Sequence, residues 1–159
     1  MTLAFYRANA TKATFLDKFI ALFSGGEFSH VELILGDITY GQVASSFSAR
    51  PFTAGVGYRD IRYNKKDWEL VSIGHSSHRN SVLSQCTIYN RLKYNYVGAI
   101  LSIFKLNFNP SKTKWYCSEV VEQCLLDGID GLHIYKDKSW QSTPNRMYKY
   151  LMDNGFKPM

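Results

Sequence analysis

The spacing of apolar residues changes near the middle of this chain, and this change constrains its fold most strongly. Up to residue 73, several short segments alternate apolar and polar side chains and are rich in β-branched and aromatic residues, which favours strands. From residue 81 onward, apolar residues recur three and four positions apart, as they do on helices. Strands followed by helices predict an α+β domain rather than an alternating α/β domain.

The individual elements follow from the same patterns. Five strands are expected, at Leu3–Arg7, Ser29–Leu35, Ile38–Ser46, Val56–Tyr63 and Trp68–Ile73. Gly36-Asp37 predicts a tight hairpin turn after the second strand, and residues 64–67 predict a turn between the last two. Helical or apolar segments are expected at residues 15–23, 81–94, 97–106 and 117–126, and from Pro144, with Thr143 as its N-cap. The 159 residues contain no repeat or low-complexity linker, so a single domain over residues 1–159 is expected.

The net charge of +6 is spread along the chain, and its longest basic run is the pair Lys65-Lys66. This distribution predicts a mildly basic surface, with attraction to anionic partners as the second interpretation, and no nucleic-acid partner is expected. The apolar run Val97–Phe104 is too short to cross a bilayer, and the N-terminus has no signal-peptide pattern. We therefore expect no transmembrane segment and a cytoplasmic location.

The three cysteines are Cys86, Cys117 and Cys124, an odd number without disulfide or CxxC spacing. Cys86 and Cys124 lie on apolar stripes and are predicted to be core residues. Cys117 begins the stripe that continues through Val120 and Val121, so it is either one more core residue or a thiolate at a helix start. Free backbone N–H groups and the positive end of the helix dipole favour a thiolate there.

The strand predicted at Ser29–Leu35 carries two polar side chains on one face, because His30 and Glu32 are two residues apart. One interpretation is a polar edge that faces solvent. The other is an imidazole base whose orientation is fixed by a neighbouring carboxylate, as in hydrolases with a nucleophile, a base and a third orienting residue. The sequence alone leaves both open.

No metal or cofactor is expected. His75 and His78 form an HxxH pattern before Cys86, but no second pair of ligands accompanies it, and His133 is isolated. Nucleotide-binding and zinc-protease motifs are absent from the sequence.

Two motifs together resemble the circularly permuted NlpC-type papain-like cysteine hydrolases, in which the histidine strand precedes the cysteine helix. They are SHVEL at Ser29–Leu33 and WYCSEVV at Trp115–Val121. Gly55–Arg59 opening a strand, Trp68 before a strand, and Thr143–Asn145 opening a helix fit the same pattern. The chain is similar to the compact members found in bacteriophages. The resemblance implies a papain-like antiparallel sheet packed against helices, with the nucleophile at a helix N-terminus.

The resemblance also implies roles for particular residues. Cys117 would be the nucleophile, its backbone N–H would help to hold the oxyanion, and His30 would be the general base. Tyr116 matches an aromatic position in the cleft. Relatives often take the third polar residue from the strand after the histidine strand, where this chain has only Gln42, Ser45 and Ser46 and no acid. Glu32 is therefore the first choice for the orienting residue and Gln42 the second, and Tyr116, Gln42 and Ser45 are expected to face the substrate.

The activity implied is cleavage of an amide bond in a cell-wall peptide or isopeptide, or of an ester or thioester, so the expected partner is a peptide-like or acyl substrate. An acyltransferase acting on lipid, a non-enzymatic phage or host interaction module on the same scaffold, and a small nucleic-acid binder are the alternatives. A phage enzyme would act in the host cytoplasm or be delivered through a phage particle or lysis pore.

Overall fold

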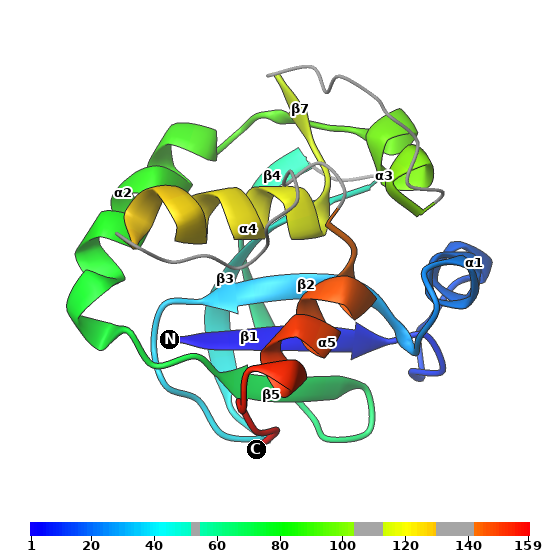
Figure 1. Cartoon of the computed structure of the whole chain (residues 1–159), viewed down its shortest axis with the longest axis horizontal. Coiled ribbons are helices and arrows are strands. Elements are labelled where there is room, and N and C mark those ends of the chain that lie inside the picture. Colours follow the sequence, from blue (N-terminus) through cyan, green and yellow to red (C-terminus); the bar gives the residue numbers. More distant parts are fainter. Residues whose placement is uncertain (52–54, 104–112, 130–141) are drawn as a thin grey trace.

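A computed structural model describes residues 1–51, 55–103, 113–129 and 142–159. It has the α+β architecture that the sequence predicts (Figure 1). The strands are β1 (Thr2–Arg7), β2 (Phe28–Ile34), β3 (Val43–Arg50), β4 (Gly55–Arg62), β5 (Trp68–Ser72), β6 (Lys93–Tyr94) and β7 (Lys114–Trp115). The helices are α1 (Phe15–Phe23), the 3-10 turn η1 (Ser76–His78), α2 (Arg79–Tyr89), α3 (Tyr96–Ile103), α4 (Cys117–Gly128) and α5 (Pro144–Asp153).

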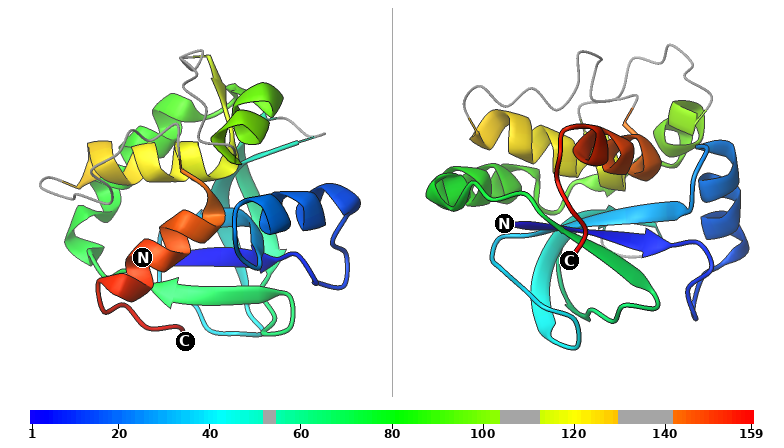
Figure 2. Two further views of the ribbon diagram at one scale, coloured as in Figure 1. Left: turned by 45° about the vertical axis from the view of Figure 1, so that its right-hand side comes forward. Right: turned by 60° about the horizontal axis from the view of Figure 1, so that its bottom comes forward.

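Five strands form one antiparallel sheet in the order β4-β3-β2-β1-β5, and β6 pairs with β7 in a short parallel sheet. Helices α2, α4 and α5 lie on one face of the five-stranded sheet (Figure 2). Helix α1 lies at the end of the sheet where β2 begins, beside α3. The N-terminus of α4 points toward the same end (Figure 1).

The main core lies between this sheet and its covering helices. Val31 and Leu33 from β2 meet Val120 and Val121 from α4 there, and all four are fully buried. A smaller apolar cluster fills the opposite face, built around Ala4, Ile34, Ile38, Tyr63, Trp68 and Leu70. Because β2 contributes to both clusters, its side chains are buried on both faces, and a polar side chain at its centre needs partners inside the protein.

Two expected hairpins are wrong in detail. No tight turn forms at Gly36-Asp37, because Ile34 pairs with Ser46 and β3 begins only at Val43. Ile38 leaves the predicted strand and is buried in the smaller cluster. The predicted pairing of the fourth and fifth strands also fails, since β5 pairs with β1 on the other side of the sheet.

Burial explains where β5 lies. Four of its five residues are buried, with Leu70 in the smaller cluster and Val71 in the main core, whereas Tyr58 of β4 is exposed. Pairing with the buried strand β1 lets both faces of β5 contribute to a core.

The helix ends follow from local chemistry. Thr14 and Asp17 form a capping box at the start of α1, and the Thr143 hydroxyl accepts a hydrogen bond from the backbone of Arg146 at the start of α5. Helix α2 is shorter than the expected 81–94, because Asn90 is extended and Arg91 has a φ of 69°. Residues 104–106 of the predicted apolar segment 97–106 lie outside the described residues.

Candidate active site

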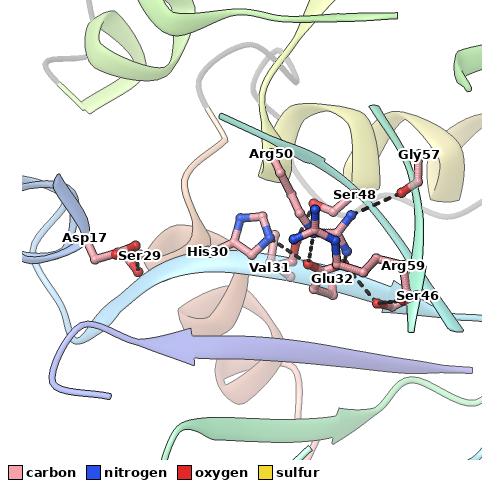
Figure 3. A network of polar contacts seen from close by, with 10 residues as sticks. All are labelled: Asp17, Ser29, His30, Val31, Glu32, Ser46, Ser48, Arg50, Gly57 and Arg59. Carbon is pink, nitrogen blue, oxygen red and sulfur yellow. Dashed lines mark hydrogen bonds and ion pairs between the residues drawn. The ribbon is translucent and has the colours of Figure 1, made fainter. Parts of the chain in front are cut away.

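Strand β2 brings His30 and Glu32 together on one face, as its period of two residues requires (Figure 3). His30 Nε2 lies 2.8 Å from Glu32 Oε1. The side chain of His30 is 16% exposed, whereas that of Glu32 is only 1% exposed. The polar pair is therefore not a solvent-facing edge, and the imidazole is the member that solvent or a substrate can reach.

The Glu32 carboxylate is fully occupied by hydrogen-bond donors (Figure 3). Arg50 Nε donates to Oε1 at 2.8 Å and Arg50 Nη2 donates to Oε2. The hydroxyl of Ser46 donates to Oε2 at 3.0 Å. Burial alone would raise the pKa of Glu32, but His30 and Arg50 outweigh it and hold the pKa below its usual range. Glu32 is therefore an anion at neutral pH and can act as a fixed partner for a positively charged imidazole.

Strand β3 supplies both of these donors, and its pleat explains why. Ser46, Ser48 and Arg50 alternate along the strand, so they share one face with Glu32 of the neighbouring strand. The Ser48 hydroxyl donates to the carbonyl of Val31 at 2.7 Å, which ties β3 to β2 beside the site. Arg50 Nη1 also donates to the carbonyl of Gly57 at 3.3 Å.

Cys117 is the first residue of α4, as the sequence predicts. Tyr116 before it is extended, with φ −110° and ψ 172°, and its N–H donates to Glu119 Oε2 at 3.4 Å. The first intrahelical hydrogen bond runs from the N–H of Val120 to the carbonyl of Tyr116. The N–H of Cys117 comes earlier in the helix and is one of the N-terminal N–H groups without an intrahelical acceptor. Cys117 as a residue is 6% exposed and therefore nearly buried.

His30 interacts with both Cys117 and Glu32. Burial lowers the pKa of His30, but charge and hydrogen-bond interactions with Cys117 and Glu32 outweigh it and raise the pKa to about 10. Since Nε2 faces Glu32, Nδ1 is the ring nitrogen left for the sulfur. His30 is thus an imidazolium at neutral pH, beside the ionised carboxylate of Glu32.

Two cavities adjoin this centre. The larger has a volume of about 330 Å³ and is lined by His30, Glu32 and Arg50 together with residues of α1, β4 and β5. The smaller, about 10 Å³, is lined by Tyr116 and Cys117 among others. Ile20, Ser29 and Tyr94 line both cavities, so the two cavities adjoin at these residues.

Of the other residues expected to face a substrate, only one lines a cavity beside this centre. Tyr116 is buried beside Cys117, in the wall of the smaller cavity. Gln42 and Ser45 are exposed and line neither cavity. The Gln42 side chain instead accepts a hydrogen bond from the N–H of Thr39 at 3.0 Å. The second choice for the orienting residue therefore lies away from the imidazole, and the first choice, Glu32, contacts it.

Sequence reasoning missed Arg50, although a signal was present. A buried carboxylate needs a cation, and Arg50 lies an even number of residues after Ser46, but the strand was expected to end at Ser46 whereas β3 continues to Arg50. Tyr94 and Arg59, which line the larger cavity, had no comparable signal because their places depend on tertiary packing.

The remaining cysteines and histidines lie outside this centre. Cys86 and Cys124 are fully buried, as predicted, and burial raises the pKa of Cys124. His75 and His78 lie around η1, with ring centroids 5.9 Å apart. Within the described ranges, no three metal-ligating side chains gather into a group that could hold a metal ion. His133 lies outside those ranges.

Comparisons of the chain with protein-family models, curated proteins and solved structures give no significant match. Among the described helices, none combines the length and the apolar character needed to cross a bilayer.

Proposed function

We propose that this protein is a thiol-dependent hydrolase that cleaves an amide, ester or thioester bond through an acyl-enzyme on Cys117. Two features of His30 support the proposal: its Nε2 lies 2.8 Å from the carboxylate of Glu32, and charge and hydrogen-bond interactions with Cys117 raise its pKa. Nucleophile, imidazole and orienting acid are the three parts of a cysteine hydrolase site.

The first chemical step uses the charged form of His30. The imidazolium stabilises negative charge on Cys117 Sγ, which bonds to the substrate carbonyl carbon. The carbonyl oxygen becomes an oxyanion near the N–H of Cys117 at the start of α4. His30 then gives its proton to the leaving nitrogen, oxygen or sulfur of the amide, ester or thioester, and the bond from the carbon to that atom breaks.

The second step releases the acyl group. His30 is now neutral and accepts a proton from water, whose oxygen bonds to the thioester carbon. The carbon–sulfur bond breaks, the carboxylic acid leaves, and the thiolate and imidazolium are restored. Glu32 orients the ring throughout and stabilises its positive charge, so the general-base role expected of His30 belongs to this second step.

The order of the parts along the chain supports a permuted papain-like assignment within this proposal. The histidine strand β2 precedes the cysteine helix α4, and the sheet that carries His30 is antiparallel and covered by α4. Under this assignment Tyr116 would contact the substrate, and a cell-wall peptide or isopeptide in a phage setting is the substrate class that we put forward.

Acyl transfer to a lipid acceptor is the second candidate function, because α1 exposes large apolar side chains beside the larger cavity. Phe15 is 84% exposed and Leu22 is 74% exposed, while Leu16 and Ile20 of the same helix line the cavity. A transferase would yield an acylated acceptor, whereas a hydrolase yields a free acid. Mass spectrometry of the products of a model ester in the presence of lipid vesicles distinguishes the two.

Alkylation tests the proposed reactivity. Iodoacetamide at pH 7 is expected to modify Cys117 at least about tenfold faster than Cys86 or Cys124, as followed by peptide mass spectrometry. Burial also protects Cys86 and Cys124, so the decisive comparison is His30→Ala, which is expected to slow the modification of Cys117. His78→Ala is the matched control, because His78 lines neither of the two cavities. Equal rates for Cys117 in both variants would contradict the proposal.

A further inference from the structure

The larger cavity beside His30 has mostly apolar walls that come from separate parts of the chain. Leu16 and Ile20 of α1, Ile61 of β4, and Trp68 of β5 all line it. Its volume of about 330 Å³ lies within the range of small-molecule sites, and it is large enough for an aromatic side chain or a short acyl chain.

Most charged groups in this cavity already have partners. Glu32 is bound by Arg50, Ser46 and His30. Asp17 belongs to the cap of α1, where it accepts hydrogen bonds from the N–H of Thr14 at 2.7 Å and from the hydroxyl of Ser29 at 2.8 Å.

Arg59 differs from these groups. Its side chain is exposed and forms no ion pair with any residue in the described ranges, although it lines the cavity. Arg59 pairs with Ser46 across β3 and β4, and directly paired residues of antiparallel strands share a face. Its side chain therefore rises on the same face of the sheet as Glu32 and His30.

We propose that this cavity binds an apolar group that carries a carboxylate, with Arg59 pairing with the carboxylate and the α1, β4 and β5 side chains enclosing the apolar part. A guanidinium matches a carboxylate with two parallel hydrogen bonds, and the apolar part of the ligand, once enclosed, holds the carboxylate next to Arg59. The cavity is lined by three positive groups, Arg50, Arg59 and the imidazolium of His30, and by two negative groups, Glu32 and Asp17. Its net positive charge favours an anionic ligand.

The position of the cavity suggests a use for this binding. It meets the Cys117 cavity at Ile20, Ser29 and Tyr94, so a group bound there lies next to the bond that the sulfur would attack. This use rests on the proposed hydrolase function, and it makes Arg59 a specificity residue for substrates with a carboxylate near the cleaved bond. The binding itself does not require a reactive sulfur.

The test measures binding in the Cys117→Ala variant of the whole chain, which cannot form an acyl-enzyme. N-acetylphenylalanine and N-acetylphenylalaninamide present the same apolar group with and without a carboxylate, and calorimetry or NMR titration gives their affinities. The acid is expected to bind about tenfold more tightly than the amide, and Arg59→Gln is expected to remove that difference. Arg62→Gln is the matched control, since Arg62 is on the same strand and does not line the cavity.

Each outcome decides the inference. Equal affinity for both ligands, no binding of either, or a preference for the acid that survives Arg59→Gln would overturn it. Leu16→Trp, which fills the cavity, is expected to weaken both ligands, with circular dichroism confirming that the variant is folded. Alkylation of Cys117 in the unmodified protein tests the hydrolase proposal separately. If either the hydrolase proposal or the binding proposal fails, the other can still be tested.

Discussion

Glu32 shows how a buried carboxylate can be maintained at the centre of a sheet. A lone anion there would be protonated or expelled, because burial disfavours its charge. Two donors from Arg50, one from Ser46 and the contact with His30 occupy its oxygens. The same contacts that stabilise the carboxylate fix one nitrogen of His30, so stability and ring orientation depend on the same group.

The charge of His30 provides a direct test of these contacts. Replacing Glu32 by Gln removes a negative neighbour, so the pKa of His30 is expected to fall from about 10 toward its unperturbed value near 6.5. Cys117→Ala is expected to lower it for the same reason. NMR titration of the His30 ring protons measures both shifts, with Ser45→Ala, an exposed change on β3, as the control. An unchanged pKa in both variants would show that neither group holds the imidazolium.

The pH dependence of folding follows with opposite signs for the two residues. The raised pKa of His30 gives stability that is fully present below about pH 6.5 and is lost as the pH rises through about 10. The lowered pKa of Glu32 gives stability that is present above its ordinary pKa and is lost as the pH falls. The pair therefore contributes most to the stability of the fold between about pH 4.5, the ordinary pKa of Glu, and about pH 6.5, the ordinary pKa of His.

Helix α4 begins beside a small cavity and is buried along most of its length. Cys117 meets a cavity, while Glu119 and Glu122 are almost completely buried within the next two turns. Burial raises the pKa of Glu119 to about 7 and that of Glu122 to about 8. Ser142 lowers the pKa of Glu122, but burial outweighs this contact, so ionisation of Glu122 inside the protein is unfavourable.

Replacing Glu122 by Gln tests this cost. The folded protein binds the Glu122 proton more tightly than the unfolded chain, so stability falls as the pH rises from about 4.5 to about 8. Glu122→Gln removes this loss and is expected to raise the free energy of unfolding by about 2 kcal/mol at pH 9, with little change at pH 5. Urea unfolding at the two pH values measures it, and Asp153→Asn at the exposed end of α5 is the control. A gain of equal size at both values would point to packing instead of ionisation.

The sequence predicts local features of this molecule better than its long-range pairing. The cap at Thr143, the helix at Phe15–Phe23 and the start of α4 at Cys117 follow from neighbouring residues, and the structure confirms them. The contact between His30 and Glu32 follows from the period of one strand. All of these depend on residues only a few positions apart.

Strand order and the wider site depend on distant residues. β5 lies beside β1 because both of its faces join a core, and no local pattern distinguishes this position from a hairpin with β4. Arg50 reaches Glu32 because of the register in which β3 pairs with β2. That register depends on a long connection between the two strands, where a tight turn was expected. The approach of Cys117 to His30 required the resemblance to a known family, because 87 residues separate them along the chain.

Asn145 joins segments that are far apart along the chain, and its removal should weaken the whole fold. Its Oδ1 accepts from the N–H of Phe28 at 2.8 Å, and its Nδ2 donates to the carbonyl of Phe28 at 2.8 Å and to the hydroxyl of Ser24 at 2.5 Å. Asn145→Ala would leave the backbone groups of Phe28 without these partners in a buried site. The expected loss in the free energy of unfolding is about 2–4 kcal/mol.

The measurement also tests the single-domain organisation. Urea unfolding followed by far-ultraviolet circular dichroism and by tryptophan fluorescence should give coincident transitions, shifted together to lower urea in Asn145→Ala. Asn154→Ala is the matched control, because Asn154 donates to the carbonyl of Tyr150 at 2.8 Å but is exposed, and it is expected to change stability by less than about 0.5 kcal/mol. Separate transitions for the two signals would mean that α5 and the sheet unfold independently, and Asn145 would then be a local contact instead of a link across one cooperative domain.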